Sequence, residues 1–405
     1  MRRLCLAALL LLLPALGLTA EPAETPRHIK PPGTDLGLPF TPGMLSEDFL
    51  FLSGAIGNEP GTKVVTGDMA AQTHQTLANL KDVLDAAGLD FSRVVETTVY
   101  LSDLRHIGEM SRARSKYEDL YPASTLVEAD VAIPNAYIEA SAIAARPHLK
   151  IETITPDGWP EPRGQYRWAK KAGNTLFLAG QVGTNPKTGH LAGPDIESQT
   201  RQVLANIDAI LKAAGMSKKD VASCRVYLPD ARDFAAMNGI YREYFDHEPP
   251  ARATTRARLA SENFKIEIQC IAVAGVERQA VHPAGATASN LPFSPAIRAG
   301  NRLYLSGMVG RGPDGYPAGI EAQTEVVLDR LHATLKAAGL DFSHVENATV
   351  WLTDIRHYGQ MNDVYRRTLP DPPPARATVG SVLMSPEALV EIAMTARIPE
   401  GAGAE

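Results

Sequence analysis

The chain carries one short arginine-bearing phrase twice and a related phrase without its arginine once. The phrases are "EPPARATTRA" at 248–257, "PPPARATVGS" at 372–381 and "YPASTLVEA" at 121–129. Their shared position holds Arg252, Arg376 and Ser124 in turn. Arginine keeps its charge and offers a planar fork of donors that fits a carboxylate better than lysine does. A single arginine after Pro-Pro-Ala is more typical of a surface or ion-pair residue, so the residues that accompany it matter.

A glutamate on an apolar closing strand follows each intact phrase. Glu267 lies in "KIEIQC" and Glu391 lies in "LVEIAM". A carboxylate is costly to bury without a partner, and an enclosed cleft can raise its pKa into a range useful for proton transfer. In "NAYIEA" we place Tyr137 at this position, with Glu139 two residues further on. The copy without arginine is therefore predicted to lack the glutamate too. A purely structural Arg–Glu salt bridge remains the alternative.

These phrases belong to three copies of one domain. Similar segments begin at residues 70, 197 and 321, and their glutamines Gln72, Gln199 and Gln323 are 127 and 124 residues apart. A period this long indicates tandem domains, because solenoid repeats usually span about 20–50 residues. We predict domains at 36–146, 165–278 and 289–398, joined by proline-rich connectors.

Each copy has the same order of predicted elements. An apolar strand ends in a glycine, and an amphipathic helix, a β-branched strand, a second helix and two closing strands follow. The core-facing side of the first helix in copy two is Val203, Leu204, Ile207, Ile210 and Leu211. Its end is marked in the three copies by Gly88, Gly215 and Gly339. Strands grouped with two helices predict an α+β fold with helices on one face of a sheet.

Taken in this order and spacing, the copies resemble the RidA/YjgF family of reactive-intermediate imine and enamine deaminases. The resemblance is carried by the "SG" strand end, the "PARAT" phrase and the closing strand with its glutamate. It implies a chorismate-mutase-like α+β fold and a trimer whose active clefts lie between neighbouring subunits. Three linked copies would then close into an intramolecular pseudo-trimer.

The resemblance also implies roles for individual residues. Arg252 and Arg376 would bind the substrate carboxylate, while Glu267 and Glu391 would orient or activate the attacking water. Further substrate-binding positions match Gly180, Gly307, Tyr166, Asn238, Asn362 and Ser306. The first copy is expected to have a degenerate site, although Phe40 or Ser111 could form a wall of a neighbouring one. The glycines and aromatic residues are also consistent with simple packing.

Bulk composition restricts the alternatives. A net charge of −6 and the lack of a Lys/Arg cluster interleaved with aromatic residues argue against binding nucleic acid. This makes ribonuclease activity, described for some relatives, the least favoured function. The ten histidines have no metal-ligand spacing, and no phosphate-binding or dinucleotide motif is present. We therefore predict neither a metal nor a cofactor.

The N-terminus has the pattern of a secretory signal. "MRR" precedes an apolar run, and "TA" leads into polar sequence, which predicts a signal peptide at 1–20 and a periplasmic or secreted protein. An uncleaved anchor is the alternative, but the run from Leu4 to Leu18 is short and contains a proline. Of the remaining cysteines, Cys224 and Cys270 are predicted to be small buried strand residues, and their pairing is left open.

The predicted function is hydrolytic deamination of small 2-imino or enamine carboxylic acids of the 2-iminopropanoate and 2-iminobutanoate type. The products would be a 2-oxo acid and ammonia. Two alternatives use the same fold. One is a non-catalytic module that binds small carboxylates, and the other is a structural or chaperone-like protein.

Overall fold

A computed structural model describes residues 26–34, 36–63, 65–117, 119–285 and 290–399. The predicted signal peptide at 1–20 lies outside the described residues. No helix within the described ranges has the length and apolar character needed to cross a membrane.

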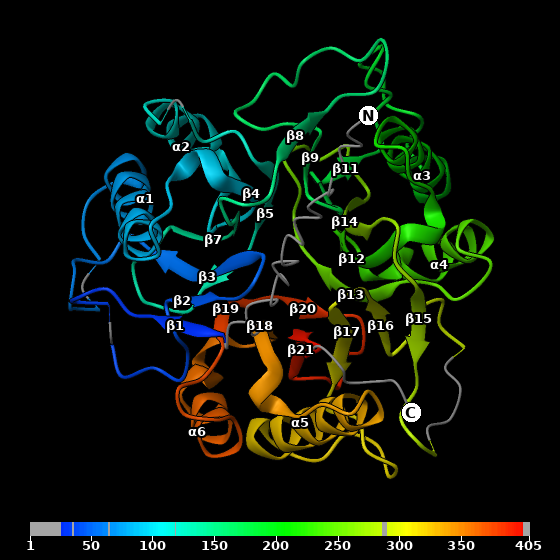
Figure 1. The fold of residues 1–405 in the computed structure, drawn as a ribbon. Coiled ribbons are helices and arrows are strands. Elements are labelled where there is room, and N and C mark those ends of the chain that lie inside the picture. The colour runs from blue at the N-terminus through cyan, green and yellow to red at the C-terminus, as the bar shows by residue number, and fades with distance from the viewer. Residues whose placement is uncertain (1–25, 35, 64, 118, 286–289, 400–405) are drawn as a thin grey trace, which may run out of the picture.

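Three α+β domains follow one another along the chain (Figure 1). The first contains β1 (Arg27–Ile29), β2 (Gly43–Leu45), β3 (Phe49–Ile56), α1 (Met69–Ala86), η1 (Phe91–Arg93), β4 (Val94–Leu101), η2 (Leu104–His106), α2 (Ile107–Arg114), β5 (Ala123–Glu128), β6 (Asp130–Val131) and β7 (Ile138–Ala145). The second contains β8 (Ile151–Ile154), β9 (Ala169–Ala172), β10 (Thr175–Leu178), β11 (Gln181–Val182), α3 (Ile196–Ala213), η3 (Lys218–Asp220), β12 (Val221–Leu228), η4 (Ala231–Asp233), α4 (Phe234–Tyr244), β13 (Ala251–Arg256) and β14 (Glu267–Val273). The third contains β15 (Arg278–Val281), β16 (Ala296–Ala299), β17 (Arg302–Val309), α5 (Ile320–Ala337), η5 (Phe342–His344), β18 (Val345–Leu352), η6 (Ile355–His357), α6 (Tyr358–Thr368), β19 (Ala375–Gly380), β20 (Val382–Leu383) and β21 (Val390–Arg397).

The first helix of each domain forms as its sequence predicts. All five residues of the predicted apolar face of α3 are buried. The side chains of Asp68 and Asp195 accept hydrogen bonds from the first turns of α1 and α3, which satisfies N–H groups that have no partner within the helix. The glycines that follow α1, α3 and α5 all have φ between +71° and +73°, a backbone region that glycine adopts without strain.

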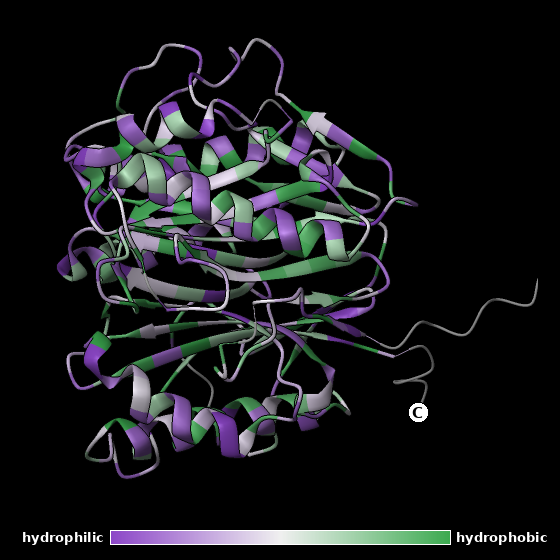
Figure 2. Cartoon of the chain, turned by 90° about the vertical axis from the view of Figure 1, so that its left-hand side faces the viewer, coloured by the Kyte–Doolittle hydropathy of each residue, from purple (hydrophilic) through white to green (hydrophobic). Residues whose placement is uncertain are grey.

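The sheets face the centre of the molecule and the helices lie outside (Figure 1). The closing strand of each domain, β7, β14 or β21, lies inside its sheet. The central strand orders of the three sheets are β3-β7-β4-β5, β10-β14-β12-β13 and β17-β21-β18-β19. Figure 2 shows largely apolar strands inside, with helices that mix polar and apolar residues around them. The connectors are not simple linkers, because β8 and β15 extend the second and third sheets.

Strand pairing closes the domains into a ring. Strand β20 of the third domain pairs with β13 of the second, and β6 of the first pairs with β19 of the third. The amide of Glu128, at the end of β5, donates to the carbonyl of Arg258 in the second domain at 3.0 Å. The predicted intramolecular pseudo-trimer is therefore the architecture of this chain.

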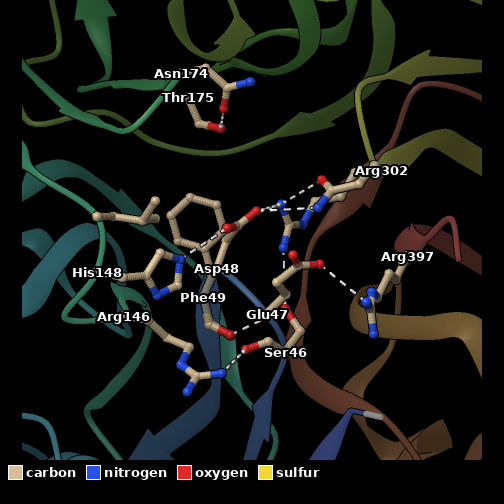
Figure 3. A network of polar contacts seen from close by, with 12 residues as sticks. Ser46, Glu47, Asp48, Phe49, Arg146, His148, Asn174, Thr175, Arg302 and Arg397 are labelled. Atoms are coloured by element: carbon tan, nitrogen blue, oxygen red, sulfur yellow. Dashed lines mark hydrogen bonds and ion pairs between the residues drawn. The ribbon is translucent and has the colours of Figure 1, made fainter. Parts of the chain in front are cut away.

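Charged side chains stabilise the contact between the first and third domains (Figure 3). The buried guanidinium of Arg302 donates to Glu346 of its own domain at 3.1 Å and to Asp48 of the first at 3.2 Å. Arg397 pairs with Glu47 at 3.1 Å. If the two domains separated, the guanidinium of Arg302 would lose Asp48 and that of Arg397 would lose Glu47. The loss of a partner from a buried charge is unfavourable, so this network stabilises the contact between the domains.

One arginine connects all three domains. The Nη1 of Arg225, on β12, donates to Thr98 Oγ1 on β4 at 3.2 Å, and its Nη2 donates to Thr349 Oγ1 on β18 at 3.3 Å. The neighbouring residue Cys224 lies opposite Cys270 of β14 and forms a disulfide with it. The two cysteines are thus buried strand residues, as predicted, and they are also paired.

Candidate functional site

Each arginine of the repeated phrase faces the next domain of the ring. The amide of Arg252, on β13, donates to Ser306 Oγ of the third domain at 2.8 Å. The amide of Arg376, on β19, donates to Ser53 Oγ of the first domain at 2.8 Å. At the same position of β5, the carbonyl of Ser124 accepts from the amide of Gly180 in the second domain at 3.2 Å. The candidate site residues therefore meet between domains.

The buried glutamates show which residues face one another. A backbone amide of the strand that carries Arg252 donates to Glu391, and the charges of these two residues interact. The carboxylate of Glu139 accepts from Thr378 at 3.2 Å and interacts with Arg376. Glu267 accepts from Leu126, on the strand that carries Ser124. We call these the 2/3, 3/1 and 1/2 sites. The first number is the domain that supplies Arg252, Arg376 or Ser124, and the second is the domain that supplies the glutamate.

This geometry corrects the pairing read from the sequence. Within each copy, arginine and glutamate belong to different sites: Arg252 faces Glu391, while Glu267 faces the strand of Ser124. Glu139, and not Tyr137, is the counterpart of the other two glutamates, since Glu139 lies opposite Ile56 just as Glu391 lies opposite Val309. Of the arginine and the glutamate, the first domain has therefore lost only the arginine. The signal that was missed is the β-branched residue directly before each glutamate, which is Ile138, Ile266 or Val390.

Burial raises the pKa of all three glutamates. Desolvation lifts the pKa of Glu139, Glu267 and Glu391 to about 8 in each case, and a backbone N–H donor opposes the shift. A strand-end glycine makes room for each carboxyl group. A Cβ on Gly180 or Gly307 would lie 1.8 or 1.9 Å from the Oε1 of Glu267 or Glu391. These glycines are thus required by the position of the glutamate.

The guanidinium groups are held by aromatic faces and retain free donors. Arg252 is 2 % exposed and lies 4.7 Å from the ring of Tyr241 and 5.4 Å from that of Phe293. Its Nε and Nη1 have no hydrogen-bond partner among the described residues. Burial lowers its pKa to about 10, so it stays charged at neutral pH. An unpaired buried cation of this kind favours an anionic ligand.

The 3/1 site repeats this arrangement and contains a cavity of about 100 Å³. Arg376 lies 4.6 Å from the ring of Tyr365 and 5.4 Å from that of Phe40. Its Nη2 donates to Asn362 Oδ1 at 2.7 Å, while Nε and Nη1 lack a described partner. Phe40 thus forms a wall of a site whose arginine comes from another domain. The equivalent Asn238 is buried in the second domain, and its Oδ1 has no described partner.

The 1/2 site combines the remaining predicted residues without the arginine of the phrase. Tyr166 contributes its ring, and burial together with the charge of Glu267 raises its pKa to about 12. The hydroxyl of Ser124 lies 2.9 Å from that of Thr97. Arg114 on α2 is buried, with Nε and Nη2 unpartnered among the described residues. It occupies the helix position that holds Tyr241 and Tyr365 in the other domains.

The chain belongs to the RidA/YjgF family. The family described as endoribonuclease L-PSP matches it three times, over residues 36–146, 158–274 and 284–398. A RutC family protein of Pyrococcus horikoshii is 50 % identical over 121 residues, which are 30 % of this chain and 96 % of that protein. Reactive Intermediate Deaminase A of Arabidopsis thaliana, chloroplastic, is 39 % identical over 33 % of this chain and 71 % of its own length. A protein of Dermatophagoides farinae named 2-iminobutanoate/2-iminopropanoate deaminase is 32 % identical over 28 % of this chain and 89 % of its own length.

These relatives correspond to single domains of the chain. Among the described residues, no group of three or more His, Cys, Asp or Glu is arranged to hold a metal ion. The chemistry of the sites is that of a buried guanidinium facing a buried carboxyl group, within a family whose members include reactive-intermediate deaminases.

Proposed function

We propose that this protein hydrolyses small 2-imino and enamine carboxylic acids, of the 2-iminopropanoate and 2-iminobutanoate type, to a 2-oxo acid and ammonia. The reaction takes place at the 2/3 and 3/1 sites. The observation that carries the proposal is a buried arginine with unpartnered donors facing a buried glutamate of the next domain. The names of the deaminase relatives support the same reaction class.

Arginine supplies the affinity for substrate. The free Nε–H and Nη–H groups of Arg252 or Arg376 form charge-assisted hydrogen bonds with the carboxylate of the imino acid. This fixes the C=N carbon beside the glutamate of the neighbouring domain. Orientation of an already electrophilic carbon next to one water molecule removes much of the entropic barrier to hydrolysis.

Glutamate moves the protons. With a pKa of about 8, the carboxyl groups of Glu391 and Glu139 titrate close to neutral pH, where proton transfer is most effective. The carboxylate form takes a proton from the attacking water as the oxygen bonds to the imine carbon. The same group then gives that proton to the nitrogen, which leaves an intermediate with a hydroxyl and an amino group on one carbon. It next carries the hydroxyl proton to the nitrogen as the C–N bond breaks and the C=O bond forms, so that ammonia leaves with the 2-oxo acid.

The test is the rate at which an imine disappears. An amino-acid oxidase generates 2-iminopropanoate from alanine, and its decay is followed with and without the purified protein. The wild-type protein should accelerate the decay, and the R252A/R376A variant should not. R256A is the matched control, because Arg256 lies on β13 too but is exposed and donates to the Pro229 carbonyl. Equal rates for wild type and R252A/R376A would refute the assignment of these arginines.

A non-catalytic carboxylate-binding module is the second candidate, and one observation favours it. Both sites with an arginine have a phenylalanine at the aromatic position, Phe40 or Phe293, whereas the hydroxyl of Tyr166 lies in the site without one. Pyruvate binding that depends on Arg252 and Arg376, with no acceleration of imine decay, would establish this alternative.

For localisation, we propose export to the periplasm or the cell exterior through the N-terminal signal. The buried disulfide between Cys224 and Cys270 supports an oxidising compartment, since reducing cytosol disfavours such bonds. The intact mass of the protein purified from its native source would test this. Cleavage after Ala20 is expected, and a full-length cytosolic chain would contradict the proposal.

A further inference from the structure

The two arginine-bearing sites differ in charge at their outer ends. Ile56 lies opposite Glu139 in the 3/1 site, and Val309 lies opposite Glu391 in the 2/3 site. Two residues after these positions, the first domain has Asn58 and the third has Arg311. A neutral amide in one site is therefore replaced by a cation in the other.

A second exchange of the same kind lies on the first helix of each domain. Asn79 of α1 donates to the carbonyl of Ile56 at 2.8 Å, and Arg330 of α5 donates to the carbonyl of Val309 at 2.7 Å. The two side chains bond to equivalent carbonyls, so they occupy equivalent places. This hydrogen bond holds the Arg330 guanidinium next to the residue that pairs with Glu391.

The surroundings of these positions differ in the same direction. Asn58, Asn79, Asp82 and Ile133 line the cavity of the 3/1 site, together with Leu38. Three residues after Arg330, the third domain has Ala333 where the first has Asp82.

Ile133 is likewise replaced, by Ser385. Each of these residues precedes its buried glutamate by six positions. Two residues after them, the carbonyls of Asn135 and Glu387 both accept from the glutamine of the first helix, at 2.9 Å, which confirms that the two loops are equivalent. The 2/3 site thus gains two cations and loses an acid and an apolar wall.

The charges of these two exposed arginines interact with each other. Desolvation lowers the pKa of Arg330, the interaction with Tyr316 opposes this, and the charge of Arg311 lowers the pKa further. Neither arginine forms an ion pair with a carboxylate among the residues that the structure describes. Like charges that interact are unfavourable in the free protein, and an anion placed between them and Arg252 would relieve the repulsion.

We propose that the two sites divide substrates by side-chain charge: the 2/3 site takes 2-imino dicarboxylates, and the 3/1 site takes imines with apolar side chains. This rests on the proposed deaminase function. In the 2/3 site Arg252 binds the carboxylate next to the imine carbon, and Arg311 and Arg330 bind the one on the side chain. In the 3/1 site Asp82 repels a second carboxylate, while Leu38 and Ile133 contact an apolar side chain.

The first test separates the sites by substrate. Imines are generated by amino-acid oxidases from glutamate or aspartate, from leucine and from alanine. R376A leaves only the 2/3 site active, and it should retain turnover of the acidic imines and lose that of the leucine imine. R252A should show the reverse. Identical substrate profiles for these two variants would overturn the proposal.

The second test exchanges the distinguishing residues. R311N/R330N introduces the residue types that the first domain already accommodates, and it should lower kcat/KM for the acidic imines about tenfold while leaving the alanine imine unchanged. N58R/N79R should raise turnover of the acidic imines at the 3/1 site. K212N/K219N is the matched control, because it removes the same charge from exposed positions of the second domain. An unchanged rate for acidic imines in R311N/R330N would refute the role of these arginines.

Binding measurements keep this inference separate from the deaminase proposal. Calorimetry with 2-oxoglutarate and pyruvate requires no turnover. R311N/R330N should weaken binding of 2-oxoglutarate about tenfold and leave that of pyruvate unaltered. This binding result would support the division of ligands between the two sites even if the protein did not hydrolyse the alanine imine. A lack of hydrolysis would refute only the deaminase activity. Equal loss for both ligands, or none for either, would overturn the division.

Discussion

The pairing of arginine and glutamate across domains can be tested by combining substitutions. R252A and E391Q both alter the 2/3 site, so the double variant R252A/E391Q should be as active as either single variant. R252A combined with E139Q alters both arginine-bearing sites and should abolish turnover of the alanine imine. E267Q alone should have almost no effect, because its site holds Ser124 in place of the arginine.

The magnitude follows from burial of the arginine. Arg252 is 2 % exposed, and removal of one partner from a buried hydrogen-bonded charge pair costs about 2–5 kcal/mol. Each 1.36 kcal/mol corresponds to a factor of about ten in rate. The altered site would therefore keep at most about 4 % of its activity. If the two sites contribute equally, each single variant and the R252A/E391Q variant retain about half of the wild-type rate.

The assay is the imine-decay measurement with alanine as the amino acid, at equal concentrations of folded protein. Far-UV circular dichroism and thermal unfolding establish that each variant is folded. If arginine and glutamate acted within one domain instead, R252A/E267Q would equal R252A, and R252A/E391Q would be inactive. That result would refute the cross-domain assignment.

Three further predictions concern activity and stability. S124R/R114Y supplies the 1/2 site with an arginine and with the tyrosine ring that packs on the arginine in the other sites, so the alanine-imine rate per chain should rise by about half. S124R alone places a second buried cation near Arg114 and should lower the melting temperature. The buried carboxyl groups with a pKa of about 8 stay protonated in the folded state up to that pH, whereas in the unfolded chain they ionise above about pH 4.5. Denaturant titrations should therefore show the unfolding free energy falling as pH rises from about 4.5 to 8. E391Q should reduce the slope of this fall by the contribution of one carboxyl group, at most about 1.4 kcal/mol per pH unit. C224S/C270S opens a cross-link between residues 46 apart and should lower the unfolding free energy by about 4 kcal/mol, measured in urea against the oxidised wild type.

The domain plan could be predicted because it depends on local patterns. The apolar spacing of α3 and the glycine at its end determine a helix whose buried face is visible in the sequence. The repeated phrases also identified Arg252 and Arg376 as candidate ligand-binding residues. Both are buried, with unpartnered donors, as a carboxylate site requires.

The partners of these residues could not be predicted in the same way. A repeat shows which positions are equivalent, but it does not show that the arginine of one copy meets the glutamate of the next. The misplaced Tyr137 has a related cause. It lies two residues before Glu139, so a period of two in the sequence does not separate the two positions, but Tyr137 precedes β7 and is exposed whereas Glu139 is buried. The amide of Tyr137 donates to Gln72 at 2.7 Å, as those of Lys265 and Leu389 do to the equivalent glutamines, and this fixes the register.

Joining three domains in one chain allows the three sites to differ, which a homotrimer does not permit. In a symmetric trimer every substitution appears in all three interfaces. Loss of the arginine at Ser124 would then have removed all clamps at once, and Arg311 and Arg330 would have surrounded every site. In this chain each interface combines two different domains, so the phrase and the glutamate that form one site can change without affecting the others. Arg225, which bonds to Thr98 and Thr349 of the other two domains, shows the same asymmetry at the centre, where three equivalent arginines would repel one another. The tandem arrangement is thus the physical condition for one protein to hold two distinct arginine-bearing sites and a third site with serine in place of the arginine.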